Sequence, residues 1–438
     1  MAKPHPSPHS DKVAQAVQLQ RQGQLDEARK IYRAVLRKQP GNADALHFLG
    51  VLMHQTGHSE PAVDMIARAL AFNPRYTDAH LNLGNILREM GRLDDAAARY
   101  RQLLALVPGH ALALNNLGVV LRNQGRALES LAVLQQGLAA HPDQADLHFN
   151  LGKTWRELDE IQQALDAFRC AISLNPQHAD ARWGLWDLLM GADRRDEALA
   201  ALRDWLAADP GNPVALHHLA ASGGADEVPG RASDRYVQQT FDDFASSFDK
   251  VLTGLDYQAP ALVTQALQRH LPPARRQFDL LDAGCGTGWC GPLIEPWART
   301  LVGVDLSAGM LSRARGRKVY HRLIETELVS HLTLSQAAYD VVVSADTFNY
   351  FGELGPLFRA AHGALRGPGL LVFTLERADT GTATDYRLLP HGRYAHRQDL
   401  VEPLLRASGF ELLSIETVAL RKETGQTVWG LLICAAHR

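Results

Sequence analysis

Three glycines at alternate positions form the stretch of this 438-residue chain best suited to ligand chemistry. The apolar run 278–283 contains Asp282 near its end, and Gly284, Gly286 and Gly288 come directly after it. Glycine permits a left-handed backbone and a close approach of the main chain to a ligand. The pattern therefore predicts a loop that leaves a strand, opens a helix and binds a dinucleotide, a phosphate or another ligand.

The neighbouring residues exclude two of these ligands. A dinucleotide-binding Gly-x-Gly-x-x-Gly sequence needs glycine at position 289, where this chain has Trp289. A phosphate-binding P-loop needs Lys and then Ser or Thr after its last glycine, and neither follows Gly288. No Arg or Lys lies between residues 277 and 298 to meet a phosphate. We therefore expect a ligand that carries no polyphosphate.

The Asp-x-Gly-x-Gly-x-Gly sequence resembles motif I of the class I S-adenosylmethionine-dependent methyltransferases, and the resemblance extends over about residues 234–438. It implies S-adenosylmethionine as the cofactor and S-adenosylhomocysteine as its product. By this resemblance Asp305 accepts hydrogen bonds from both ribose hydroxyls, a task that suits the two oxygens of a carboxylate. Glu327 is expected beside the adenine, with Glu325 as the alternative. The implied cofactor-binding residues are Asp282, Gly284, Cys285, Gly286, Gly288, Asp305, Leu306, Met310, Glu327, Leu328, Ala345 and Asp346.

Methyl transfer from a sulfonium needs a nucleophile in line behind the methyl group and, where the nucleophile is weak, a base. The catalytic candidates are His396, because histidine titrates near neutrality, and Tyr350. The alternative is that His396 only holds its loop by hydrogen bonds. Candidates for contact with the acceptor in the same segment are Tyr386, His391, Arg393 and Tyr394. The sequence predicts no metal site, and it lacks the Asn/Asp-Pro-Pro-Tyr motif of enzymes that methylate DNA adenine or glutamine.

A 34-residue period runs through the first half of the chain. Prolines recur at this spacing, at Pro40, Pro74, Pro108, Pro142, Pro176 and Pro210. Each period predicts two helices, the second of which ends before the proline. The pattern resembles the tetratricopeptide repeat over about residues 10–222, as six copies that end in a capping helix at 213–222. Such repeats stack into an α solenoid with a concave groove.

Two rows of polar residues follow the same period and are predicted to bind a substrate in that groove. One row is Asn82, Asn116 and Asn150, whose amides could pair with the main chain of an extended peptide. The other is Arg88, Arg122 and Arg156, which lies further along the same helices. The alternative for the charged row is pairing between neighbouring repeats.

The second half of the chain alternates short β-like runs with helical segments, which predicts a doubly wound, Rossmann-like α/β domain with a C-terminal antiparallel hairpin. We expect a disordered N-terminus at 1–9, repeats at 10–222, a linker at 223–233 and a methyltransferase domain at 234–438. The segment after residue 234 is expected to form a helical lid over the cofactor.

Composition restricts the partners. The net charge of −3 and the lack of a basic, aromatic patch argue against nucleic acid. Without a signal peptide or a long apolar run, we expect no membrane association and a cytoplasmic location. The leading hypothesis is a methyltransferase that acts on a protein or peptide recruited by the repeat groove. The alternatives are a small-molecule methyltransferase whose repeats bind a partner or form a homodimer, and a scaffold that binds S-adenosylmethionine without turnover.

Overall fold

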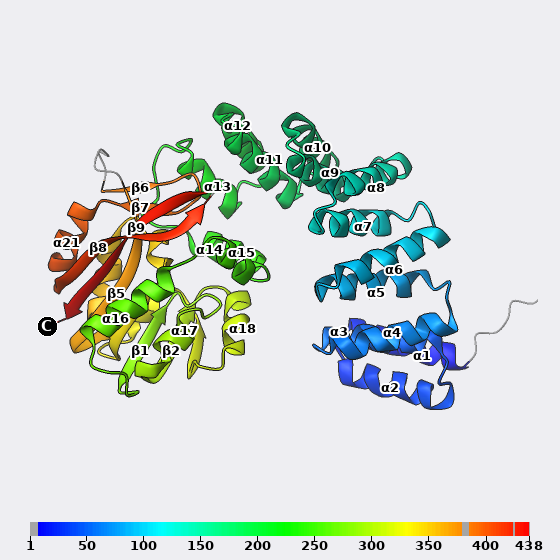
Figure 1. Cartoon of the computed structure of the whole chain (residues 1–438), viewed down its shortest axis with the longest axis horizontal. Helices are drawn as coiled ribbons and strands as arrows, with labels where there is room; N and C mark the ends of the chain where they lie inside the picture. Colours follow the sequence, from blue (N-terminus) through cyan, green and yellow to red (C-terminus); the bar gives the residue numbers. More distant parts are fainter. Residues whose placement is uncertain (1–7, 379–384, 424, 438) are drawn as a thin grey trace, which may run out of the picture. The chain divides into compact units, whose positions relative to one another are not determined.

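The computed structural model describes residues 8–378, 385–423 and 425–437 and divides into two compact units, Met1–Ala201 and Leu202–Arg438 (Figure 1). The predicted disordered segment 1–9 lies outside the described residues, except for Pro8 and His9, which begin the first helix. No helix among the described residues is both long and apolar enough to cross a membrane.

The first unit is a row of antiparallel helix pairs. Its helices are α1 (Pro8–Arg21), α2 (Leu25–Lys38), α3 (Ala43–Gln55), α4 (Ser59–Phe72), α5 (Thr77–Glu89), α6 (Leu93–Leu106), α7 (Ala111–Asn123), α8 (Ala127–Ala140), α9 (Ala145–Glu157), α10 (Ile161–Leu174) and α11 (Ala179–Gly191). In the four pairs from α3 to α10 the two helices approach closely because the first helix carries a glycine at the contact. A Cβ on Gly84 would stand 2.5 Å from the Tyr100 ring, and one on Gly118 would stand 2.7 Å from Leu134. The 34-residue period predicted from the sequence therefore reflects the repeated packing contacts of the helix pairs.

The turn inside each pair needs a left-handed residue. Gly91 has φ +75° and Gly125 has φ +74°, and the same turn position is taken by Asp159 and Asp193 in the last two pairs. Asp tolerates this conformation better than most residues that carry a side chain. The turn therefore persists where the glycine of the sequence pattern is lost.

The second unit holds a nine-stranded sheet. The strands are β1 (Phe278–Ala283), β2 (Ala298–Asp305), β3 (Arg322–Glu325), β4 (Tyr339–Ser344), β5 (Leu365–Arg377), β6 (Tyr386–Leu388), β7 (Tyr394–His396), β8 (Phe410–Glu423) and β9 (Gln426–His437). The order is β3-β2-β1-β4-β5-β7-β6, with β9 antiparallel to β5 and β8 antiparallel to β9. Strands β1 to β5 are parallel, so their carboxyl ends meet at one edge. This is the predicted doubly wound sheet with its C-terminal hairpin.

Helices cover both faces of this sheet. The helical elements of the second unit are α13 (Pro213–Ala221), α14 (Asp234–Phe244), α15 (Phe248–Gly254), α16 (Ala259–His270), α17 (Gly291–Ile294), η1 (Glu295–Trp297), α18 (Ala308–Gly316), α19 (Leu328–Leu334), η2 (Thr347–Tyr350), α20 (Leu354–Ala364) and α21 (Gln398–Ala407), and α12 (Arg195–Ala208) contains the boundary between the units. Leu280 packs with α16 on one face, and Leu281 packs with α19, α20 and α21 on the other. Two cores thus fix β1 and the loop that follows it.

The helix predicted to cap the repeats, α13, packs within the second unit. The Nε2 atom of His217 lies 2.8 Å from the Gly392 carbonyl oxygen, and the His217 ring stacks on Tyr236 of α14 with centroids 3.8 Å apart. His218 contacts both the Pro390 carbonyl and the Tyr236 hydroxyl. The predicted linker 223–233 therefore connects two helices that share one hydrophobic cluster.

Candidate functional site

The glycine loop after β1 presents one open face. All three glycines have positive φ, but only two of them are enclosed by side chains. A Cβ on Gly284 would meet the Thr347 hydroxyl at 2.0 Å, and one on Gly288 would meet Tyr320 at 2.9 Å. At Gly286 the nearest atom would be a ring carbon of Phe248, 3.9 Å away. Gly286 is thus the position where a ligand can approach the main chain.

Asp305 lies beside this open glycine. Its Oδ2 accepts a hydrogen bond from the Gly286 amide at 2.8 Å, and its Oδ1 accepts one from the Ser307 amide at 2.9 Å. Burial raises the pKa of Asp305, although these amide donors act in the opposite direction. Each carboxylate oxygen keeps a second lone pair for a hydroxyl. The geometry therefore suits the role that the sequence resemblance implies for Asp305.

Asp282 lies below the loop and is fully buried. The hydroxyl of Tyr320 donates to its Oδ2 at 2.6 Å. Burial raises the pKa of Asp282 to about 7, the Tyr320 bond lowers it, and the charge of Asp305 raises it. Burial likewise raises the pKa of the Cys285 thiol, so this predicted cofactor contact is a neutral thiol. Tyr320 was missed from the sequence because nothing in its neighbours distinguishes it.

The other implied cofactor residues lie at the carboxyl edge of the sheet. Leu306 follows β2, Met310 is buried in α18, Leu328 is buried in α19, and Ala345 and Asp346 follow β4. Glu327 accepts hydrogen bonds from the Val329 and Ser330 amides and so caps α19. It also pairs with Arg231 at 3.0 Å. Its carboxylate is therefore already engaged by the protein, whereas Glu325 at the end of β3 is exposed.

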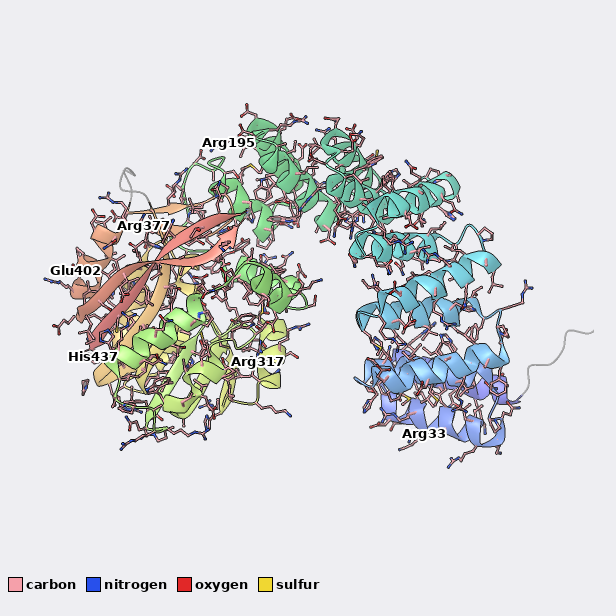
Figure 2. The ribbon with its side chains drawn as sticks, viewed as in Figure 1. Arg33, Arg195, Arg317, Arg377, Glu402 and His437 are labelled. Atoms are coloured by element: carbon pink, nitrogen blue, oxygen red, sulfur yellow. The ribbon has the colours of Figure 1, made fainter. Side chains whose placement is uncertain are left out.

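Asp249 of α15 fastens the predicted lid helices to the glycine loop. Its Oδ1 accepts from the Thr287 hydroxyl at 2.5 Å and from the Trp289 indole at 2.8 Å. Its Oδ2 accepts from Arg317, which is labelled in Figure 2, at 2.8 Å. Phe248, which precedes Asp249, is the residue whose ring carbon lies 3.9 Å from the place of a Cβ on Gly286.

Asp242 of α14 makes a second attachment, earlier in the chain. Its Oδ1 accepts from the Ser307 hydroxyl at 2.5 Å and from the Gly309 amide at 3.0 Å, at the start of α18. We did not identify Asp242 or Asp249 from the sequence. They lie on two separate helices, α14 and α15, so no helical spacing in the sequence pointed to both.

A cluster of buried ion pairs lies beyond the end of β4. Asp346 has a left-handed backbone, with φ 64°, and its amide donates to the Thr374 hydroxyl at 2.9 Å. Arg421 of β8 donates to Asp346 Oδ2 at 2.7 Å and also bonds Glu376 of β5. A left-handed residue other than glycine costs roughly 1–3 kcal/mol and persists only where its surroundings hold it. Sequence reasoning missed Arg421 and Glu376, which are far from Asp346 along the chain.

Two predicted acceptor contacts belong to this cluster. Arg393 donates to Glu376 at 2.5 Å and also bonds Glu423, while His391 lies 3.3 Å from Glu376. Burial opposes ionisation of Glu376, but His391, Arg393 and Arg421 together hold its pKa below its usual range. The Arg393 charge is therefore balanced by two carboxylates of the protein itself.

The remaining candidates pack around the same strands. His396 is buried, and its Nε2 lies 3.1 Å from the Gly352 carbonyl oxygen. Burial lowers the pKa of His396 to about 4, so its ring is neutral at pH 7. Tyr350 packs edge-on against Phe241 of α14 at 5.4 Å between centroids. Tyr386 packs edge-on against the buried Tyr394 at 5.6 Å.

The asparagine row in the first unit joins neighbouring repeats. Each amide nitrogen donates to the preceding helix pair, through the contacts Asn82 to His47 (2.8 Å), Asn116 to Asn85 (2.9 Å) and Asn150 to Asn115 (2.9 Å). In the arginine row, Arg122 lies 3.4 Å from Glu157 and Arg156 lies 2.8 Å from Asp187. Both rows therefore make contacts between helix pairs, and the asparagines do so at every step.

Comparison with known proteins agrees with this division. Residues 281–373 match a family model described as a methyltransferase domain, and residues 19–222 are covered by matches to tetratricopeptide-repeat models. The chain thus carries tetratricopeptide repeats followed by a methyltransferase domain, which confirms the two family resemblances and the fold class predicted from the sequence.

The chain is also similar to proteins with assigned names. A probable S-adenosylmethionine-dependent methyltransferase of Mycobacterium tuberculosis is 30% identical over 145 residues, which are 33% of this chain and 53% of that protein. A malonyl-[acyl-carrier protein] O-methyltransferase of Geobacter sulfurreducens is 28% identical over 145 residues, 32% of this chain and 53% of that protein. The chain therefore spans about half the length of these relatives. The solved structure of Pseudomonas aeruginosa pilF is 19% identical, with a TM-score of 0.41, over 47% of this chain and 93% of pilF.

Proposed function

We propose that this chain, with its tetratricopeptide repeats and methyltransferase domain, transfers a methyl group from S-adenosylmethionine to a protein or peptide acceptor. The observation that carries the proposal is the pairing of the open Gly286 with the Asp305 carboxylate at the carboxyl edge of a parallel sheet. Open α/β sheets bind ligands at this edge. A carboxylate held by two amides is oriented for two further donors, which the ribose of the cofactor supplies.

The chemistry asks little of the protein beyond alignment and the exclusion of water. When bound, S-adenosylmethionine supplies an electrophilic methyl group. The nucleophile of the acceptor would form the new bond to the methyl carbon as the carbon–sulfur bond breaks with its electrons going to sulfur, and the proton of the acceptor would pass to a base, for which His396 is the proposed residue. His396 and Tyr350 remain the proposed catalytic residues. His396 is neutral at pH 7, as a base must be, but its lowered pKa makes it a weak base.

The acceptor class is supported by the repeats, because solenoids of this kind offer an extended binding surface. The substrate contacts we propose are the asparagine and arginine rows, together with Tyr386, His391, Arg393 and Tyr394 near the donor site. A small-molecule or carrier-bound acceptor is the second candidate. It is favoured by the similarity to malonyl-[acyl-carrier protein] O-methyltransferases, whose name specifies such an acceptor.

Two measurements test the proposal. Calorimetric titration with S-adenosylmethionine should show one site in the wild type and at least tenfold weaker binding in Asp305→Asn, because one charged acceptor of hydrogen bonds is lost. Incubation with methyl-labelled donor and a cell extract should then label a polypeptide. Label found only in small molecules would favour the second candidate. Donor binding without any labelled product would instead indicate a scaffold that binds the donor without turnover.

A further inference from the structure

The arginine row in the repeats has hydrogen-bonding capacity that the protein does not use. The Nε of Arg88 and the Nη1 of Arg122 are buried and have no hydrogen-bond partner in the part of the chain that the structure describes. Arg122 is 7% exposed, and its only ion pair among these residues is the long contact with Glu157. Buried donors normally find partners, and an unsatisfied one costs about 1–3 kcal/mol. Two such donors one repeat apart indicate a ligand.

A lysine adds a further positive charge at the same place. Lys153 of α9 extends over the Phe149 ring, with its ammonium nitrogen 5.3 Å from the ring centroid. Burial lowers the pKa of Lys153, and Arg122 and Arg156 lower it further by repulsion, while Asp180 and Glu157 raise it. Burial also lowers the pKa of Arg122, Glu157 raises it, and Arg156 lowers it. Repulsion among these cations is therefore offset only in part by the carboxylates of the protein.

The nearby carboxylates offset these charges only in part. Within the described ranges, neither Arg88 nor Lys153 has an ion pair with a carboxylate. Glu89 pairs with His54 at 2.9 Å and Asp146 lies 3.4 Å from His178, whereas Glu157 and Asp187 pair with Arg122 and Arg156 of the row itself. The asparagine amides are likewise used between helix pairs. Among the described residues, the groups of this surface with unused capacity are thus Arg88 and Lys153, which have no carboxylate partner, and the Nη1 donor of Arg122.

We propose that Arg88, Arg122 and Lys153 bind acidic side chains of an extended polypeptide, which adds a ligand class to the proposed function and rests on it. Asp or Glu side chains would supply both the missing acceptors and the missing charge. A polypeptide fits better than a nucleic acid, because Asp78 and Asp146 stand ten residues before the arginines of their own helices. At 1.5 Å per residue, each of these Asp residues lies roughly 15 Å along the helix from its Arg. A nucleic acid carries phosphates along its whole backbone, so these Asp side chains would repel it. A polypeptide with spaced acids avoids that repulsion.

Fluorescence anisotropy with the full-length chain tests this assignment. The probe is a labelled 15-residue peptide with Glu at every third position in a Gly/Ser background. Its controls are the same peptide with Gln for Glu and a 15-nucleotide oligo-dT. We expect the Glu peptide alone to bind, with affinity falling as salt rises. Equal binding of the Gln peptide, or tighter binding of the oligonucleotide, would overturn the assignment.

Variants then locate the contact. The double variant Arg88→Gln/Lys153→Gln should bind the Glu peptide about tenfold more weakly, since two charge-assisted contacts are lost. Lys153 is exposed and Arg88 is half-buried, and neither belongs to a hydrophobic core, so the fold should tolerate the change. Arg99→Gln removes the same kind of charge from α6, outside the row, and should bind as the wild type does. Unchanged affinity in the double variant would refute the assignment. Binding of S-adenosylmethionine is measured on the same samples. If S-adenosylmethionine binds and the Glu peptide does not, the peptide assignment fails while the proposed methyltransferase stands.

Discussion

The buried carboxyl of Asp282 should make the second unit less stable as the pH rises. Its pKa is raised from the ordinary value of 3.8 to about 7 in the folded state. Below about pH 4 both states hold the proton. Between about pH 4 and pH 7 the unfolded chain loses the proton while the folded chain keeps it, so the free energy of unfolding falls with increasing pH.

The size of the effect follows from the shift. Three pKa units correspond to about 4 kcal/mol at 1.36 kcal/mol per unit. Two of those units lie between pH 5 and pH 7, so the free energy of unfolding should fall by about 3 kcal/mol between pH 5 and pH 8. Asp282→Asn cannot ionise and keeps an oxygen for the Tyr320 hydroxyl, so this variant should not show the loss. Between pH 5 and pH 8, the free energy of unfolding of Asp282→Asn should therefore rise by about 3 kcal/mol relative to that of the wild type.

The assay is amide hydrogen exchange read on peptides from β1 and β2, which reports the second unit separately from the repeats. Protection of the wild type should fall from pH 5 to pH 8, after correction for the intrinsic exchange rate, while Asp282→Asn stays level. Tyr320→Phe removes a donor that favours the ionised form and so raises the folded pKa of Asp282 further. Its loss of protection should begin at the same pH but continue to higher pH than in the wild type. Parallel pH profiles for the wild type and Asp282→Asn would refute the argument.

Three further changes test other parts of the structure. Arg421→Gln should destabilise the second unit by roughly 3–5 kcal/mol, measured by thermal unfolding, because it leaves Glu376 buried with fewer partners. Asp305→Asn should weaken donor binding in calorimetry with little change in melting temperature, whereas a large drop in melting temperature would assign Asp305 to folding. A fragment of residues 202–438 should melt higher than one of residues 230–438, which lacks the α13 contacts. Equal melting temperatures would show that α13 contributes nothing to the unit.

The sequence by itself determined the repeats, because a solenoid repeats the same local contacts. Each glycine of the series faces a side chain of its own helix pair, so the period of the sequence equals the period of the packing contacts. It also determined the donor loop. Asp282, Gly286 and Asp305 lie at the ends of two neighbouring parallel strands, where local spacing suffices to bring them together.

Only the tertiary structure decided which polar groups are free. Tyr320 reaches Asp282 across 38 residues, Arg421 reaches Asp346 across 75, and the amide of Asn116 is used by Asn85 of the preceding helix pair. Such partners come from elements that are distant in the chain, and a sequence pattern records only the residue types. The same spacing therefore predicted two polar rows in the repeats, and burial and hydrogen bonding distinguished the row that is satisfied from the row with unused donors.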